Sequence, residues 1–399
     1  MKKTYFAIAC FLLSQCLHAQ WIKLPSFTTE PLTSVDFKDE STGLVCGHQQ
    51  IWRTTNGGDN WTAVYTGNEN ISLEEVRWAS NQVAVAVGLG QDGSKGLILR
   101  TTDGGQTWAQ VSNTIPSIFT DVYFVNENVG YLCGGNTRIL KTVNGGATWA
   151  SQFSDNDSDL FSIHFINENE GYAAGGVGGT GRLLHTTNGG DTWTDVSLPA
   201  PFLLQSVFFV SETLGFVAGV GGELRKTGNG GNDWEDLPTA NTSNILDLYF
   251  FDHNFGFLVG GTLTATSLQQ TVNSGGYWSN VAPSAGAGLF SIDFAGTTGY
   301  AVGVNGTVVK TVVTVGTKEV EDAVEVQVFP SPASEVVQVV ATEQPIRFVE
   351  IIGTSGQLLY QQQAGSTAVN LDVSGLAKGI YFLKISFENG VAMRRLVKG

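Results

Sequence analysis

Cysteine is scarce in this sequence. The 399 residues contain four cysteines, and two of these lie within the first 16 residues. The others, Cys46 and Cys133, occupy the same position in two non-adjacent copies of a repeat, which would hold them too far apart for a disulfide. We therefore expect both to be small buried residues. The fold must be held together without a disulfide framework.

The sequence also has few basic residues and few long apolar runs. Lys and Arg number 21 against 36 Asp and Glu, a formal net charge of −15. An acidic surface repels phosphates and anionic lipid headgroups, so we expect no nucleic-acid partner. Beyond the N-terminus, no stretch approaches the ~18 apolar residues of a membrane span. The few histidines lack metal-ligand spacing, and we expect neither a metal nor another cofactor.

The sequence is rich in a nine-residue phrase that ends in tryptophan. Its first complete copy is Arg-Thr-Thr-Asn-Gly-Gly-Asp-Asn-Trp at 53–61, and a slipped sixth copy ends at Trp278. The tryptophans follow one another at intervals of 41 to 47 residues: Trp61, Trp108, Trp149, Trp193, Trp234 and Trp278. A period of this length indicates a propeller or a solenoid.

The glycine pair in each phrase predicts a tight hairpin. Glycine adopts the positive φ that such a turn needs, and the preceding Asn or Asp can bond the backbone two residues further on. The tryptophan then begins the returning strand and buries a large apolar surface. Because the same chemistry recurs in every copy, we expect these residues to form the fold rather than to bind a ligand.

A second phrase precedes each turn and predicts two further strands. It consists of an apolar–variable–aromatic triplet, first seen at 35–37, followed by a strand that is mostly flanked by glycines, and it occurs seven times. The seventh copy loses its turn and tryptophan after Val312, whereas Trp21 to Leu24 precede the first copy as an isolated strand. We therefore predict an all-β fold, a seven-bladed β-propeller over residues 20–314 that the N-terminal strand closes. Closure buries two sheet edges.

The two ends of the chain are predicted to be separate from the propeller. Residues 1–19 have the basic start, apolar run and small-residue cleavage site of a secretory signal peptide. Residues 315–327 form a polar linker. Residues 328–399 contain short alternating strands, with a hairpin signal at Asn389-Gly390, and predict a small Ig-like β-sandwich.

Two resemblances follow from these motifs. The Gly-Tyr-Ala-Val-Gly strand at 299–303 and the Asn/Asp-Gly-Gly-x-x-Trp boxes resemble the Asp-box propellers of the photosystem II assembly and stability factor type, although only Asp103 keeps the aspartate. Residues 328–333, 353–357, 376–382 and 395–398 resemble the C-terminal sorting domain of the type IX secretion system of Bacteroidota, with Ser331 where that family usually has Asn.

The sorting resemblance implies where the protein goes. It implies Sec export through the periplasm, recognition of residues 328–399 by the type IX secretion machinery, and release from the cell or display on its outer surface. A role in photosystem assembly is not expected, because these delivery signals indicate a secreted protein.

One position of the inner strand varies between copies in a way that is typical of a ligand surface. The candidate ligand-binding residues at this position are Asp36, Arg77, Tyr123, His164, Tyr249 and Asp293, with Phe208 completing the set. Alternatively, these side chains pack between blades or line a wet channel. We predict a monomeric, non-enzymatic binding protein for a glycan or protein ligand.

The alternative is a secreted, sialidase-like glycoside hydrolase acting on extracellular polysaccharide, since such enzymes include Asp-box propellers. Asp36 and Asp293 would come from neighbouring blades and, with Glu75, supply the acid and the base or nucleophile. The arginine cluster of a sialidase is missing: Arg53 and Arg100 occupy a repeat position that also holds Lys and His. These basic residues are expected to be solvated and weakly ion-paired, or to form a cationic rim for an acidic polymer.

Overall fold

The computed structural model forms two compact units, Met1–Val313 and Thr314–Gly399. It describes residues 20–91, 93–112, 115–196, 198, 202–239, 243–283, 288–313, 326–330, 333–342, 344–352, 358–376, 378–387 and 390–398. The predicted signal peptide lies outside these residues, as does most of the predicted linker. No helix in the described parts is long and apolar enough to cross a membrane.

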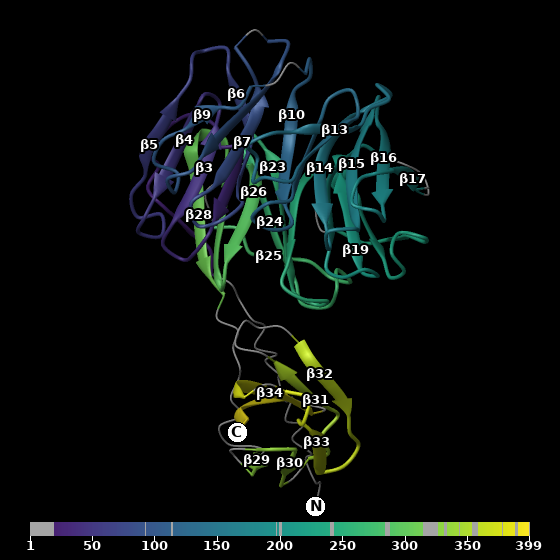
Figure 1. The fold of residues 1–399 in the computed structure, drawn as a ribbon. Coiled ribbons are helices and arrows are strands. Elements are labelled where there is room, and N and C mark those ends of the chain that lie inside the picture. The colour runs from purple at the N-terminus through teal and green to yellow at the C-terminus, as the bar shows by residue number, and fades with distance from the viewer. Residues whose placement is uncertain are drawn as a thin grey trace, which may run out of the picture. The chain divides into compact units, whose positions relative to one another are not determined.

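The first unit repeats one antiparallel four-stranded sheet (Figure 1). The described residues up to 313 contain seven such sheets, numbered here in chain order. Sheets 1 to 3 are β2 (Ser34–Phe37), β3 (Gly43–Gly47), β4 (Gln50–Thr54), β5 (Thr62–Thr66); β6 (Ser72–Trp78), β7 (Ala84–Leu89), β8 (Gly96–Thr101), β9 (Ala109–Gln110); and β10 (Phe119–Phe124), β11 (Gly130–Gly134), β12 (Arg138–Thr142), β13 (Ala150–Phe153).

The remaining four sheets have the same order, and two of them carry a short 3-10 turn. Sheets 4 and 5 are β14 (Asp159–Phe165), β15 (Gly171–Val177), β16 (Thr180–Thr186), β17 (Thr194–Val196); and β18 (Leu204–Phe209), β19 (Gly215–Gly219), η1 (Val220–Gly222), β20 (Leu224–Thr227), β21 (Glu235–Asp236). Sheets 6 and 7 are β22 (Ile245–Phe250), β23 (Gly256–Thr262), β24 (Ala265–Thr271), β25 (Ser279–Asn280); and β26 (Leu289–Ala295), β27 (Thr298–Gly303), η2 (Val304–Gly306), β28 (Thr307–Val312) with β1 (Ile22–Lys23).

The N-terminal strand completes the last sheet, as predicted. In the pairing of β1 with β28, Ile22 lies opposite Lys310 and Lys23 opposite Val309. Trp21 is only 4% exposed and packs in a cluster that includes Phe257 and Phe294. The chain end therefore supplies both backbone pairing and a large buried side chain to sheet 7, which leaves no unpaired edge at β28.

The glycine pairs form longer loops than the predicted tight hairpins. In sheet 1, β4 ends at Thr54 and β5 begins only at Thr62, one residue after the tryptophan. The Thr54 hydroxyl accepts the N–H of Gly58 at 3.0 Å, and the Asn56 side chain accepts the N–H of Asn60 at 3.0 Å. The tight-hairpin prediction was wrong because these side chains satisfy the backbone groups of a wider loop. The same two bonds recur in the other five boxes.

Four of the basic residues of the phrase bond a neighbouring sheet instead of pointing into solvent. Four of them donate to the first glycine carbonyl of the next sheet's box, each at 2.7 Å: Arg53 to Gly104, Arg100 to Gly145, Lys141 to Gly189 and Lys310 to Gly57. The last of these bonds joins sheet 7 to sheet 1. The expectation of solvated residues was wrong for these four, because a buried carbonyl that accepts from a cation is better satisfied than one left unpaired.

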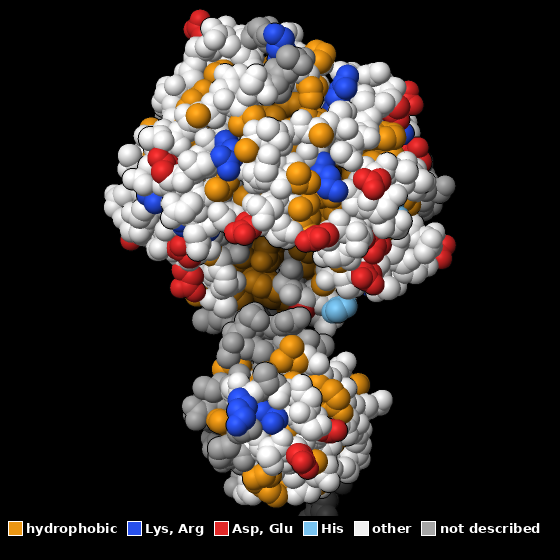
Figure 2. Space-filling model, in the orientation of Figure 1, with side chains coloured by type: hydrophobic (Ala, Val, Ile, Leu, Met, Phe, Trp, Pro, Cys, Tyr) orange, Lys and Arg blue, Asp and Glu red, His pale blue; other side chains and the backbone are white. Residues whose placement is uncertain are grey.

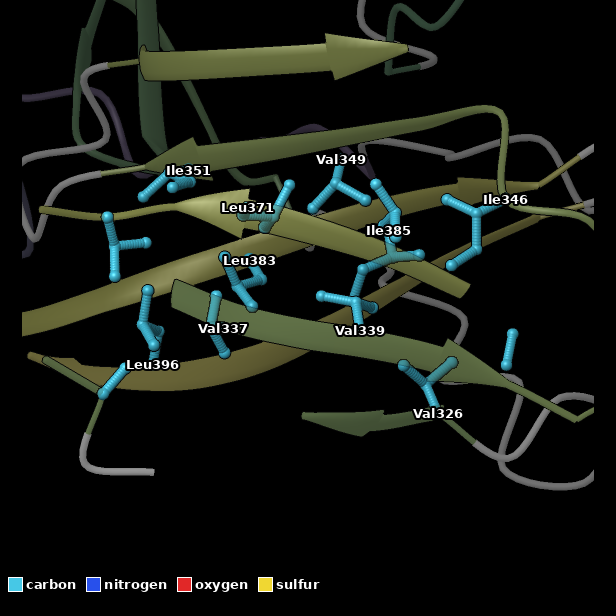
Figure 3. Close-up of a cluster of buried hydrophobic side chains, with 14 of the residues drawn as sticks. Val326, Val337, Val339, Ile346, Val349, Ile351, Leu371, Leu383, Ile385 and Leu396 are labelled. Carbon is cyan, nitrogen blue, oxygen red and sulfur yellow. The ribbon is translucent and has the colours of Figure 1, made fainter. Parts of the chain in front are cut away.

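The second unit contains two sheets around one core. The three-stranded sheet is β29 (Val326–Phe329), β30 (Val336–Ala341) and β33 (Ala368–Asp372), and the four-stranded sheet is β32 (Leu358–Gln363), β31 (Phe348–Ile352), β34 (Gly379–Phe387) and β35 (Gly390–Lys398). Figure 3 shows Val337, Val339 and Leu371 from one sheet and Val349 and Leu383 from the other within one buried cluster. β29 begins two residues inside the predicted linker. Asn389 of the predicted hairpin lies outside the described residues.

The visible surface of the first unit agrees with its acidic composition. Figure 2 shows Asp and Glu side chains spread around this unit, with fewer Lys and Arg among them. Four of the basic side chains are engaged in the bonds between sheets described above. The surface therefore offers no broad cationic rim on the face in view.

Candidate functional site: the central channel

The innermost strand of each sheet faces a central channel. These strands are β2, β6, β10, β14, β18, β22 and β26; each contacts the next, and β26 contacts β2. Because alternate side chains of a strand point to the same face, residues two apart on each strand enter the channel. Two pockets result, with volumes of about 340 and 380 Å³.

The first pocket collects every residue that sequence reasoning proposed for ligand binding. Its lining includes the complete set at the variable position, which we call the variable ring: Asp36, Arg77, Tyr123, His164, Phe208, Tyr249 and Asp293. These side chains come from seven different sheets. The structure therefore brings together residues that lie more than 250 positions apart in the chain.

A second ring of polar residues was largely missed. It lies two residues earlier on each inner strand and consists of Ser34, Glu75, Asp121, Ser162, Ser206, Asp247 and Ser291. Its members accept backbone N–H groups of the next sheet: Asp121 from Ile163 at 2.7 Å and Asp247 from Ile292 at 3.0 Å. The period of two along each strand was the signal that could have found this serine–carboxylate ring; only Glu75 was singled out.

A β-bulge lies beside the second pocket in most of the inner strands. Six inner strands shift register just before the serine–carboxylate ring, for example between Leu73 and Glu75. The extra residue, Glu74 in sheet 2, also lines the second pocket. A Cβ on Gly88 would lie 1.9 Å from the Ser72 carbonyl oxygen, so the strand beside the bulge needs glycine there. This requirement explains the second glycine of the glycine-flanked strands.

Arg77 is the centre of charge in the channel. Its guanidinium lies 3.3 Å from Asp36, 3.0 Å from Glu75 and 4.0 Å from Asp293. Burial raises the pKa of Asp36 to about 7, with the nearby Asp293 carboxylate adding to the rise. Burial likewise raises the pKa of Asp247 to about 6 and that of Glu75 well above its usual range. These raised pKa values mean that part of the carboxyl groups is protonated near pH 7, and a cation that came close to them would favour their ionised form.

The opposite side of the variable ring is aromatic. Ring centroids are separated by 5.0 Å between Tyr123 and His164, 4.7 Å between His164 and Phe208, and 5.9 Å between Phe208 and Tyr249. His164 Nε2 lies 3.0 Å from the Phe209 carbonyl oxygen and therefore donates to it. Burial lowers the pKa of His164 to about 4, so the imidazole is neutral at physiological pH.

Cys46 and Cys133 are free and buried, as expected. Asp155 pairs with Arg182 at 2.7 Å. Within the described ranges, no group of three or more His, Cys, Asp or Glu is arranged to hold a metal ion.

The fold and the channel define a propeller-like protein with an appended two-sheet unit. Family models confirm both parts: residues 13–116 and 108–203 match the photosynthesis system II assembly factor YCF48 family, and residues 327–399 match the secretion system C-terminal sorting domain. The chain thus joins YCF48-like propeller repeats to a type IX sorting domain. It is a secreted or outer-cell-surface protein.

Solved structures support the fold assignment. YCF48 from Cyanidioschyzon merolae has a TM-score of 0.60 at 20% identity, covering 73% of this chain and 99% of its own. YCF48 bound to D1 peptide has a TM-score of 0.61 at 19% identity, with coverage of 73% and 96%. The WD40 β-propeller domain of Doa1 has a TM-score of 0.59 at 13% identity, and the match covers 74% of this chain and 96% of that domain. A comparison with curated protein sequences finds no match.

Proposed function

We propose that this chain is a non-enzymatic binding protein, delivered to the cell exterior by its sorting domain, which holds a ligand at the variable ring. In this proposal the seven sheets are the blades of a closed seven-bladed propeller, and the second unit is an Ig-like sandwich that the type IX secretion machinery recognises. The contact between β26 and β2 and the two-sheet core of the second unit support these finer assignments.

The observation that carries the proposal is the contrast between adjacent positions on the inner strands. The residue after each variable-ring member is always a large aromatic: Phe37, Trp78, Phe124, Phe165, Phe209, Phe250 and Phe294. The variable-ring position itself holds acidic, basic, aromatic and imidazole side chains around one pocket. A repeat that needed this position only for packing would tend to keep one kind of side chain there, as it does at the aromatic position.

A polypeptide ligand is favoured over a glycan. YCF48, which has a similar fold, is known in a structure bound to D1 peptide. The first pocket is about 340 Å³, near the lower end of the range of about 300–1,000 Å³ for small-molecule sites, and thus holds one or two side chains. We therefore propose that a protruding segment of a protein places a side chain in the pocket.

The hydrolase remains the second candidate because of the Asp36 and Asp293 pair. A carboxyl group with a pKa of about 7 beside another carboxylate has the properties of a general acid. However, Asp36 accepts the backbone N–H of Trp78, and Asp293 accepts that of Phe37 at 2.8 Å. Both carboxylates therefore have a bridging role between sheets that accounts for their presence without catalysis.

Probing the mature full-length chain with peptide and glycan arrays, beside a chromogenic glycosidase screen, separates the two candidates. Saturable binding that is lost in Phe208→Ala, without turnover of any substrate, supports the binding protein. Turnover that disappears in Asp36→Asn or Asp293→Asn supports the hydrolase. A chain that binds no array member and turns over no substrate would overturn both.

A further inference from the structure

The variable ring has two unlike halves. Sheets 7, 1 and 2 contribute the charged residues Asp293, Asp36 and Arg77, whereas sheets 3 to 6 contribute a continuous aromatic arc. The arc consists of Tyr123, His164, Phe208 and Tyr249. A ligand group that fills this pocket must therefore satisfy carboxylates on one side and ring faces on the other.

The charged half favours a cation over an anion. The guanidinium of Arg77 already pairs with Asp36 and Glu75, at 3.3 and 3.0 Å, so an incoming carboxylate or phosphate would have to compete with both of these groups. Further carboxyl groups, those of Asp121 and Asp247, line the same pocket. An incoming anion would be repelled by the ionised carboxylates in a region of low dielectric, whereas a cation would favour the ionised form of the same groups.

The aromatic half adds a second, independent preference. Ring faces carry negative quadrupole charge and attract ammonium and guanidinium groups, and they also cover the apolar stem of such a group. Tyr123 and Tyr249 line the pocket, and the hydroxyl group of neither has a hydrogen-bond partner among the described residues. Both hydroxyls are thus available to accept from a ligand N–H group.

We infer that the pocket binds one basic side chain, Lys or Arg, of a polypeptide ligand, with its stem against the aromatic arc and its cationic head beside Asp36 and Asp293. This inference rests on the binding function proposed above and names the chemistry that the site selects. His164 faces the site as a neutral ring and does not oppose the incoming charge. Arg77 stays in its ion pairs, so only the carboxylate oxygens that it does not contact remain for the ligand.

The test uses blocked pentapeptides Gly-Gly-X-Gly-Gly and the mature full-length chain, with affinity measured by titration calorimetry or NMR. X is Lys, its uncharged analogue norleucine, Arg, its uncharged analogue citrulline, or Glu. We expect Lys and Arg peptides to bind at least about 10-fold more tightly than their uncharged analogues, the equivalent of about 1.4 kcal/mol, and the Glu peptide to bind most weakly.

Variants separate the two halves of the pocket. Asp293→Asn keeps an oxygen that can accept the Phe37 N–H and should weaken Lys binding about 10-fold, whereas Phe208→Ala should weaken Lys and norleucine peptides alike. Asp103→Asn is the matched control, because it removes one remote carboxylate at a box position where the other copies have Asn; binding should change less than about 2-fold.

The remaining outcomes contradict either this inference or the proposed function. Equal binding of Lys and norleucine, preference for Glu, or no binding of the Lys and Arg peptides overturns the inference. If array ligands still bind and Phe208→Ala still abolishes that binding, the proposed function survives the loss of this inference. If no array ligand binds either, the proposed function fails as well.

Discussion

Side chains bond neighbouring sheets both at the glycine boxes and in the central channel of the first unit. The two regions differ in how much their residues vary from sheet to sheet. At the boxes, Arg53 and Lys310 donate to box carbonyls with the same geometry in different sheets. In the channel, Asp121 and Asp247 accept backbone N–H groups in the same way. Two residues further along the inner strand, however, the side chain differs from sheet to sheet. The repeated residues join sheets, whereas the variable ring, where Asp36, His164 and Asp293 also bond the next sheet, is the position that we propose for a ligand.

The largest effect is expected where the chain closes on itself. Trp21→Ala removes a nearly fully buried side chain from the cluster of Phe257 and Phe294, and should lower the free energy of unfolding by about 3–5 kcal/mol. Urea denaturation measures the change. Ile22→Ala is the control, because Ile22 is 51% exposed and pairs only through its backbone. Equal effects of the two variants would show that the tryptophan adds nothing beyond strand pairing.

The next comparison breaks one bond between sheets at a glycine box. In Lys310→Met, the Gly57 carbonyl keeps only the hydrogen bond from the Tyr300 hydroxyl. Because a charge-assisted hydrogen bond is lost, the free energy of unfolding should fall by about 1.5–3 kcal/mol. Lys226→Met, at the equivalent position, removes an ion pair with the exposed Glu235 and should cost at most about 1 kcal/mol. Thermal unfolding of both variants gives the difference. A cost for Lys226→Met that matches Lys310→Met would argue against the role of the carbonyl bond.

The channel should make stability depend on pH. The folded-state pKa of Asp36 is about 7 and that of Asp247 about 6, both above their ordinary value of 3.8, so these two groups bind more protons in the folded chain than in the unfolded chain between these values. The stability that these two groups contribute is fully present below about pH 4 and is lost as pH rises toward 7, whereas the lowered pKa of His164 opposes part of this loss below about pH 6.5. We expect a lower Tm at pH 7.5 than at pH 5, with a smaller difference in Asp36→Asn. A Tm that rises across this range in the wild-type chain would contradict the assignment.

The smallest effect is expected in a box turn. Asp103 accepts the N–H of Thr107 and the Thr107 hydroxyl, and these bonds hold the pKa of its carboxyl below its usual range. Asn makes the same backbone bond in the other boxes, as Asn56 does in sheet 1. Asp103→Asn should therefore change the free energy of unfolding by less than about 1 kcal/mol, whereas Asp103→Ala should cost more. Chemical denaturation of the pair checks whether the side-chain oxygen or the charge matters.

Much of the site could be predicted because the sheets repeat. Once Val35-Asp36-Phe37 is aligned with Ile292-Asp293-Phe294, the equivalence of their central residues follows, and closure makes sheets 7 and 1 neighbours. The same alignment identified Arg77 and His164 as members of one ring. It did not show that Arg77 would be held by three carboxylates, because the rotamer of a long side chain depends on charges contributed by other sheets.

The bulges and the bonds between sheets could not be predicted either, because they also depend on how separate strands meet. The bulge before Glu75 depends on how β6 registers against β7, and a periodic apolar pattern does not record a one-residue shift. The bond from Lys310 to the Gly57 carbonyl crosses from one end of the unit to the other and leaves no local signal. The solvated state predicted for the basic position was wrong because propensity and charge describe a strand surface, not the sheet packed against it.

The sequence by itself determined the repeat, the four strands of each repeat, the closing strand at Trp21 and the sorting domain. Each of these depends on local periodicity and turn chemistry. The tertiary structure alone decided which of the channel carboxylates face Arg77 and how far their pKa values rise. These properties arise from distances and burial between sheets, and those exist only when all the inner strands are assembled around one channel.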